Sequence, residues 1–216
     1  LEFGNTYIRF FKDKGQILSG GSAYEISSPY LTAELFDIKF AQSADVMYIT
    51  HPNHEVMKLS RTGHTAWTLT EIDFTDGPYL AQNTSATTMA ASGTSGSVTI
   101  TASTSTFVAT DVGRLITFNS GRAKITNYTS GTQVTATTQV NFSGTGAVTT
   151  WKLGAFSNTT GHPSCVSFFE QRLVFAGTTS EPQTLYFSKA GDYENMTTGT
   201  NADDAMVYTI ASNQVN

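Results

Sequence analysis

The sequence predicts an all-β fold: an antiparallel sandwich or partial propeller-like domain that is interrupted by a small inserted β-barrel-like domain. Short runs of alternating apolar and polar residues recur about every 8 to 12 residues, with turn residues between them. Thr, which favours strands, is abundant throughout. In the first part of the chain only Ala33 to Asp37, after the capping residue Thr32, favours a helical turn.

The first third of the chain predicts a succession of strands joined by tight turns. The expected strands are, in chain order, Phe3 to Phe11, Gln16 to Leu18, Ala23 to Ile26, Asp45 to Thr50, Met57 to Arg61 and Ala66 to Phe74. Residues 12–15 supply the first turn, and residues 51–54 close the apolar strand before them. The second half of this pattern resembles a propeller blade, although no fixed repeat period recurs.

The composition changes between about residues 84 and 152, where Thr, Ser, Gly and Ala dominate and Asp111 is the single acid. The alternating runs in this segment predict strands at Ser97 to Ala102, Arg114 to Phe118, Ala123 to Tyr128, Gln133 to Ala136 and Val148 to Leu153. We therefore expect residues 84–152 to form a small inserted β-domain. Residues 1–83 and 153–216 then form one discontinuous main β-domain, because insertions are tolerated where chain ends meet at a loop.

The last quarter of the chain centres on an apolar hairpin. Cys165 to Phe175 and Thr184 to Ser188 predict two strands around a turn-rich segment. Arg172 interrupts the first strand, and an ion pair with a nearby acid is the ordinary explanation for such a residue. Cys165 is expected to be a small buried hydrophobe. A final strand-like run, Val207 to Val215, ends without a turn signal and, with Leu1 in place of Met, suggests a fragment of a longer protein.

This hairpin also carries a family resemblance. Its residues are Phe168-Phe169, Gln171-Arg172-Leu173, Leu185, Ser188, Ala190-Gly191-Asp192-Tyr193 and Asn195. Their order and spacing resemble a hairpin in the tail nozzle proteins of short-tailed bacteriophages, also called tail tubular protein B. The chain also resembles phage and prophage virion proteins over much of its length, including Tyr7 to Phe11, Ala41 to Tyr48 and Trp67 to Tyr79.

The resemblance implies a non-enzymatic structural component of a virion tail, of the nozzle or tube-adaptor type. Such a protein would be made in the cytoplasm of a bacterial host and would assemble into a ring with copies of itself and with other tail proteins. DNA would pass transiently through the lumen. The resemblance implies no catalytic residues.

A second resemblance lies within the expected insert. The motif consists of Phe107 and, after three intervening residues, Asp111-Val112-Gly113-Arg114-Leu115-Ile116. It resembles a motif of phage modules that are likened to the first catalytic-cysteine half-domain of ubiquitin-activating enzymes. The likeness concerns the fold alone and implies no ubiquitin chemistry.

Composition and net charge narrow the range of functions that the chain could have. Only 13% of residues are charged, the formal net charge is −5 and the pI is near 5.3, which argues against a nucleic-acid footprint covering a whole domain. The single cysteine excludes an intrachain disulfide. The sequence shows neither an apolar stretch of transmembrane length nor a signal-peptide pattern at its start.

Two groups of residues have the composition of metal sites. His51 and His54 are spaced to share a metal ion, with His64 as the nearest third ligand, although Pro52 favours a simple turn. Asp192, Glu194, Asp203 and Asp204 could form a calcium site, but acids of this kind usually decorate loops. We therefore expect no metal and no cofactor. A glycosidase would need two facing carboxylates, and no two acids are paired by the sequence pattern.

The expected interaction surface consists of five residues: Arg172, Arg114, Arg122, Trp67 and Trp151. The arginines would face DNA or neighbouring subunits in a tail tube. The tryptophans would serve the alternative function, a carbohydrate-binding or adhesive module that contacts a host surface.

Overall fold

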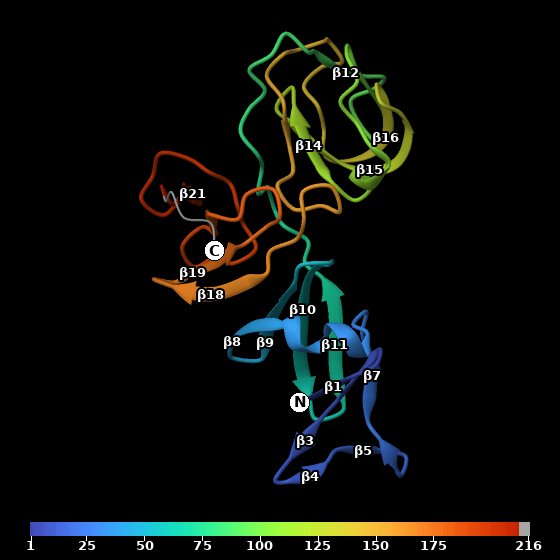
Figure 1. The fold of residues 1–216 in the computed structure, drawn as a ribbon, viewed down its shortest axis with the longest axis vertical. Helices are drawn as coiled ribbons and strands as arrows, with labels where there is room; N and C mark the ends of the chain where they lie inside the picture. The colour runs from blue at the N-terminus through green and yellow to red at the C-terminus, as the bar shows by residue number, and fades with distance from the viewer. Residues whose placement is uncertain (212–216) are drawn as a thin grey trace. The chain divides into compact units, whose positions relative to one another are not determined.

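The computed structural model describes residues 1–211, and its regular structure is nearly all β, which confirms the predicted class (Figure 1). The chain forms two compact units. The first comprises residues 1–73, 162–194 and the chain from Thr198; the second comprises residues 74–161 and 195–197. The second unit extends beyond the expected insert because the flanking segments bond to one another: Leu80 N–H donates to the Leu153 carbonyl at 2.9 Å. Each unit is described separately.

The N-terminal strands of the first unit are shorter than expected. Instead of one strand from Phe3 to Phe11, the chain forms β1 (Glu2–Gly4), β2 (Tyr7–Arg9) and β3 (Phe11–Lys12). The turn between β1 and β2 holds Thr6 at a φ of 65°, which reverses the chain within the expected strand. The strand β7 (Glu25–Ser27) completes a sheet in the order β1-β2-β7.

Two small hairpins connect β2 to β7. The strand β3 pairs with β4 (Gly15–Gln16), and β5 (Leu18–Ser19) pairs with β6 (Ser22–Ala23). Asp13 and Lys14 have φ values of 51° and 65°, as a two-residue hairpin turn of the mirror-image type requires. The turn predicted at residues 12–15 is therefore confirmed.

The expected helical turn is a 3-10 helix, η1 (Thr32–Asp37). Thr32 lies inside it and does not cap it. The carboxylate of Glu34 instead accepts the Leu31 N–H at 2.8 Å, which is the acidic half of a capping box.

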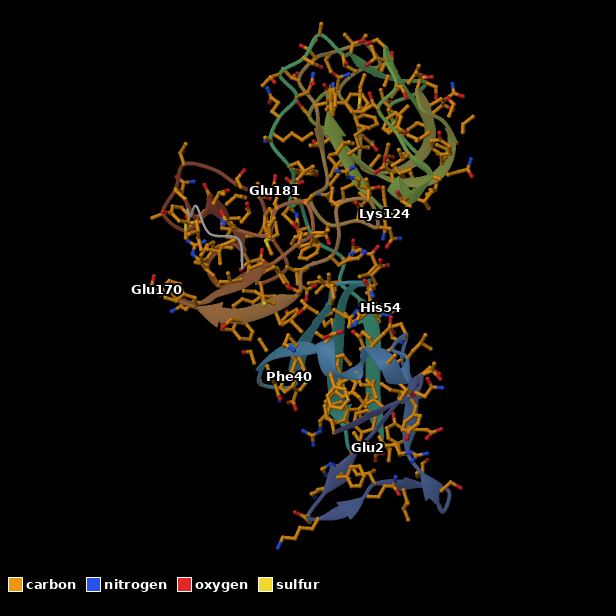
Figure 2. All side chains as sticks on the ribbon, viewed as in Figure 1. Glu2, Phe40, His54, Lys124, Glu170 and Glu181 are labelled. Carbon is orange, nitrogen blue, oxygen red and sulfur yellow. The ribbon has the colours of Figure 1, made fainter. Side chains whose placement is uncertain are left out.

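A four-stranded meander follows, formed by β8 (Lys39–Ser43), β9 (Val46–His51), β10 (His54–Gly63) and β11 (Ala66–Glu71). In Figure 2 the label of His54 marks the start of β10 and that of Phe40 lies on β8. The strand β9 is buried on both faces. Met47 and Ile49 face the core that the unit shares with Ile8, Phe10 and Tyr30, whereas Tyr48 points to the opposite face.

The hairpin predicted near the C-terminus is a second four-stranded meander. Its strands are β18 (Cys165–Phe169), β19 (Arg172–Ala176), β20 (Thr184–Phe187) and β21 (Met206–Thr209). The run from Cys165 to Phe175 is thus two strands, since Glu170 and Gln171 take positive φ values of 44° and 60° and turn the chain. Four-stranded meanders of this kind are the building unit of propellers. Residues 212–215 of the predicted last strand lie outside the described residues.

Aromatic side chains join the two meanders of the first unit. The rings of Tyr48 on β9 and Phe168 on β18 pack edge to face with centroids 6.2 Å apart, and Tyr193 packs against Phe168 at 4.9 Å. Cys165 lies on β18 with its side chain exposed, so the expectation of a buried cysteine is wrong. The reason is that β18 is an edge strand whose alternate residues, Cys165, Ser167 and Phe169, face away from the packed side.

The second unit is one antiparallel sheet curved into a half-barrel, in the order β12-β13-β16-β15-β14-β17. Its strands are β12 (Met89–Ala91), β13 (Ser97–Ala102), β14 (Leu115–Phe118), β15 (Gly121–Ser130), β16 (Gln133–Val140) and β17 (Lys152–Leu153). Ile100, Ile116 and Val134 are fully buried in its core, and Phe107 and Phe142 close that core. Among the residues that the structure describes, no helix is long and apolar enough to cross a membrane.

Candidate functional site

The first unit contains a cavity of about 610 Å³ whose lining is largely apolar. Four successive strands line it with Phe40, Met47, Leu59 and Trp67, because these residues face the same side of the β8–β11 meander. Trp67 is held in place by stacking on Phe10, with ring centroids 4.3 Å apart. Its indole N–H donates to the His64 carbonyl at 3.1 Å, so the ring has a fixed orientation.

The same cavity has polar side chains in its lining. Arg61 Nη1 lies 2.9 Å from Asp45 Oδ1, and its guanidinium carbon lies 5.9 Å from the centroid of the Trp67 ring. His64 lies within 3.4 Å of both Arg61 and Lys12 through its two ring nitrogens. A cavity with an aromatic wall and a few polar groups suits a ligand that has an apolar face and hydroxyl or anionic groups. Of the five predicted surface residues, only Trp67 lines it.

A cluster of polar side chains lies at the turn between β9 and β10, in the same unit. His51 ends β9 and His54 begins β10, and their rings are 4.9 Å apart. Glu34 of η1 reaches this turn, with Oε2 2.9 Å from His54 Nε2. One ligand atom from each of these three residues lies within 4.8 Å of the others. His64, the third ligand that the sequence suggested, instead lines the cavity.

The surroundings of this cluster determine its charge. The pKa of Glu34 is lowered, chiefly by the Leu31 N–H and then by His54, so the carboxyl group is ionised at neutral pH. The pKa of His51 is lowered by burial and by the charge of His54, which keeps its imidazole neutral. Tyr30 packs edge to face on His54 with ring centroids 5.2 Å apart, and burial raises the pKa of its hydroxyl group. The cluster thus combines an anion with neutral imidazole.

Arg172 is buried within the first unit, although the sequence predicted a surface position for it. Its side chain is 6% exposed and donates to the carbonyl oxygens of Ser188, Asp204 and Ala202 at 2.6 to 2.7 Å. The sequence suggested an ion pair with an acid. Instead, carbonyl groups of the long segment between β20 and β21 accept the hydrogen bonds of the guanidinium group. Arg172 therefore ties this segment to β19.

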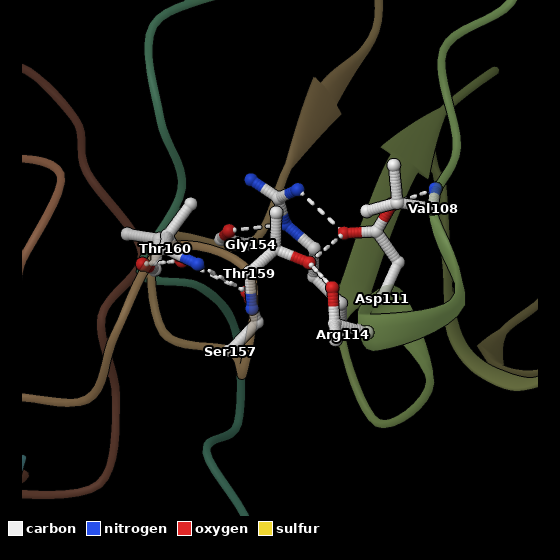
Figure 3. A network of polar contacts seen from close by, with 9 residues as sticks. Val108, Asp111, Arg114, Gly154, Ser157, Thr159 and Thr160 are labelled. Carbon is white, nitrogen blue, oxygen red and sulfur yellow. Dashed lines mark hydrogen bonds and ion pairs between the residues drawn. The ribbon is translucent and has the colours of Figure 1, made fainter. Parts of the chain in front are cut away.

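Arg114 is also buried, inside the second unit. Figure 3 shows its polar contacts with Asp111 and Gly154. Its Nη1 pairs with Asp111 Oδ1 at 2.8 Å, and its Nε donates to the Gly154 carbonyl at 2.8 Å. Asp111 also accepts hydrogen bonds from Thr159 Oγ1 at 2.7 Å and Val108 N–H at 2.9 Å. The Asp-Val-Gly-Arg sequence thus forms a buried ion pair whose further hydrogen bonds fix the segment 154–160 to the half-barrel. Arg114 is thus 4% exposed in the chain, although the sequence predicted a surface position for it.

Arg122 and Trp151 also make contacts within the second unit. Arg122 lies 3.1 Å from Asp76 and donates to Gln139 at 2.9 Å, with its side chain 12% exposed. Trp151 packs on the core and donates to the Thr87 carbonyl at 2.9 Å. The acidic residues of the suggested calcium site form ion pairs with two different lysines. Glu194 pairs with Lys58, while Asp203 and Asp204 pair with Lys189.

Sequence reasoning missed Glu34 as a neighbour of the histidine pair, and Phe40 as part of the cavity. Neither has a local signal, because both come close to their partners only through the packing of η1 and the pairing of β8 with β9. Comparison with protein-family models found no match to the chain, and a search of curated proteins found no relative.

Proposed function

We propose that the chain is a non-enzymatic structural component of a phage or prophage virion tail, of the nozzle or tube-adaptor type, which acts by assembling with copies of itself. The observation that carries the proposal is the strand β21. Met206, Val207 and Tyr208 are 45%, 44% and 63% exposed, although all three are large and apolar. Within the described chain, β21 is the outer strand of its sheet.

We expect another protein segment to cover this exposed apolar edge strand in the working protein. Its outer N–H and C=O groups are a template for another strand, and soluble monomers usually protect such edges with charges, prolines or short strands. No charged residue or proline occurs from Met206 to Ile210. A strand from a second copy would pair with β21 and bury Tyr208, as in other cases of strand addition. Repetition of one such contact around an axis gives a ring.

The resemblance of the hairpin to tail nozzle proteins supports the same proposal from the sequence. The charge distribution also suits a tube through which DNA slides. The net charge is −5 and the arginines are engaged by carboxylates or carbonyl groups, so contacts to DNA would be weak and scattered.

The experiment is sedimentation velocity over a wide concentration range, with negative-stain electron microscopy of the largest species. We expect a discrete oligomer that dissociates in Tyr208→Lys. The matched control is Ser180→Lys, an exposed loop position of the same unit, which should assemble like the unmodified chain. A chain that stays monomeric at all concentrations, or a Tyr208→Lys variant that assembles normally, would overturn the proposal.

The cavity beside Trp67 favours a second candidate function, a carbohydrate-binding or adhesive module. Sugars stack their apolar faces on aromatic rings and present hydroxyl groups to charged side chains, and the cavity offers Trp67 together with Arg61 and Asp45. A glycan array tests this candidate. Saturable binding that is lost in Trp67→Ala and kept in the exposed control Phe169→Ala would support it, and the absence of any saturable binding would reject it.

A further inference from the structure

We propose that Glu34, His51 and His54 form a binding site for a transition-metal ion of the zinc type. The site joins η1 to the turn between β9 and β10. It is independent of the assembly proposed above and uses neither β21 nor the cavity beside Trp67.

The donor set has the right chemistry. Imidazole nitrogen and carboxylate oxygen are ligands that Zn²⁺ accepts together, and three protein ligands leave a fourth position for water or another group. One donor atom from each residue lies within 4.8 Å of the other two, so small side-chain movements bring all three to a single ion. The side chains of His54 and Glu34 are 22% and 19% exposed, which gives an ion a path from solvent.

A salt bridge between Glu34 and His54 accounts for the contact between those two side chains. It does not account for the buried position of His51 beside them. His51 is 1% exposed, and its Nδ1 accepts the Asn53 N–H at 3.1 Å. Its Nε2 is buried and makes no hydrogen bond of good geometry with residues 1–211. The backbone of Glu34 interacts with the same ring and partly opposes the lowering of its pKa. A buried polar atom without a partner is costly, and such atoms often mark a site for an ion or water. The imidazole ring of His51, which carries this Nε2, lies next to that of His54, with ring centroids 4.9 Å apart.

The ligands are also held in place by a second set of contacts. The Leu31 N–H donates to Glu34 Oε2 at 2.8 Å, and the ring of Tyr30 packs on that of His54. Hydrogen bonds of this kind orient ligating carboxylates in known metal sites.

Metal binding redistributes protons in a defined way. The ion takes the place of the proton between Glu34 Oε2 and His54 Nε2, and each neutral imidazole then carries its proton on Nδ1. For His51 this change removes the acceptor of the Asn53 N–H. The site therefore forms at the cost of one hydrogen bond in the turn.

The test uses ZnCl₂ as the probe, with the chain first stripped by a chelator. Competition with a zinc-sensitive dye should give one site per chain. We expect Glu34→Gln, His51→Asn and His54→Asn to weaken binding at least about tenfold. His64→Asn is the matched control, because the sequence suggests His64 as a ligand and the structure places it in the cavity lining; its affinity should stay within about twofold. Circular dichroism checks that each variant folds.

A second measurement needs no variant. Long-range ¹H–¹⁵N spectra of the histidine rings, recorded with and without one equivalent of ZnCl₂, should show the ring nitrogens of His51 and His54 shifting while those of His64 stay in place. The absence of saturable binding, or spectra in which His64 shifts and His51 does not, would overturn the assignment.

Discussion

Arg172 Nη1 on β19 donates to the carbonyl oxygen of Asp204, which precedes β21, at 2.6 Å. The contact is made by a charged group that is 6% exposed and that has two further carbonyl partners. It fixes the loop that leads into β21, the strand on which the proposed assembly depends.

Replacement of Arg172 by Met should lower the free energy of unfolding by about 3 kcal/mol, because three carbonyl groups lose their donor. Urea unfolding followed by circular dichroism measures this loss. The control is Arg9→Met, a partly exposed ion-pair residue, for which we expect a much smaller loss of unfolding free energy. Equal losses in the two variants would contradict a special role for Arg172.

Asp111→Asn should destabilise the second unit by about 3 to 5 kcal/mol, because Arg114 is then left as a buried charge without its partner. The two tryptophans allow a unit-specific measurement, since Trp67 lies in the first unit and Trp151 in the second. In a Trp67→Phe background, the fluorescence of Trp151 should report an earlier urea transition. Asp13→Asn, at a position with an 86% exposed side chain, serves as the control and should leave that transition in place.

His162 should make the first unit less stable in mild acid. Burial and the charge of His54 lower its pKa from 6.5 to about 4, so the unfolded chain takes up a proton at a higher pH than the folded chain does. Stability that is present above pH 6.5 is therefore lost as the pH falls toward 4, by up to about 3 kcal/mol.

Urea titrations at several pH values, with chelator present, measure this dependence. The difference in unfolding free energy between the unmodified chain and His162→Asn should shrink as the pH is lowered through that window. His64→Asn, which removes an exposed histidine, should keep the steep dependence. A His162→Asn variant with an unchanged pH dependence would exclude this explanation.

Cys165 should react with a thiol reagent in the folded chain. Its side chain is exposed on the edge strand β18, so the rate of modification should lie within about tenfold of the rate in urea. Colour release from a disulfide reagent measures both rates, and Cys165→Ser gives the background. Protection by several orders of magnitude would show that the residue is covered.

Local sequence patterns were enough to predict the all-β class and many of the turns, because strands and turns depend on the properties of neighbouring residues. Two-residue turns such as Asp13-Lys14 and the strand Ser97–Ala102 follow from neighbouring residues alone. The sequence did not reveal that Glu170-Gln171 is also a turn. These residues are polar inside an apolar run, and they adopt positive φ only because the pairing of Phe168 with Leu173 favours a reversal there.

The environments of the charged and aromatic residues could not be predicted from local patterns, because they depend on how distant segments pack. Arg172 and Arg114 have the sequence character of surface groups, but carbonyl and carboxylate partners from distant segments compensate their burial. Trp67 lines a cavity and Trp151 packs on a core, although both lie in similar strand-like runs. Glu34 meets His51 and His54 only because η1 packs beside the β9–β10 turn. A local pattern specifies strands and turns, whereas the partner of a side chain is specified by which distant segments the fold brings to it.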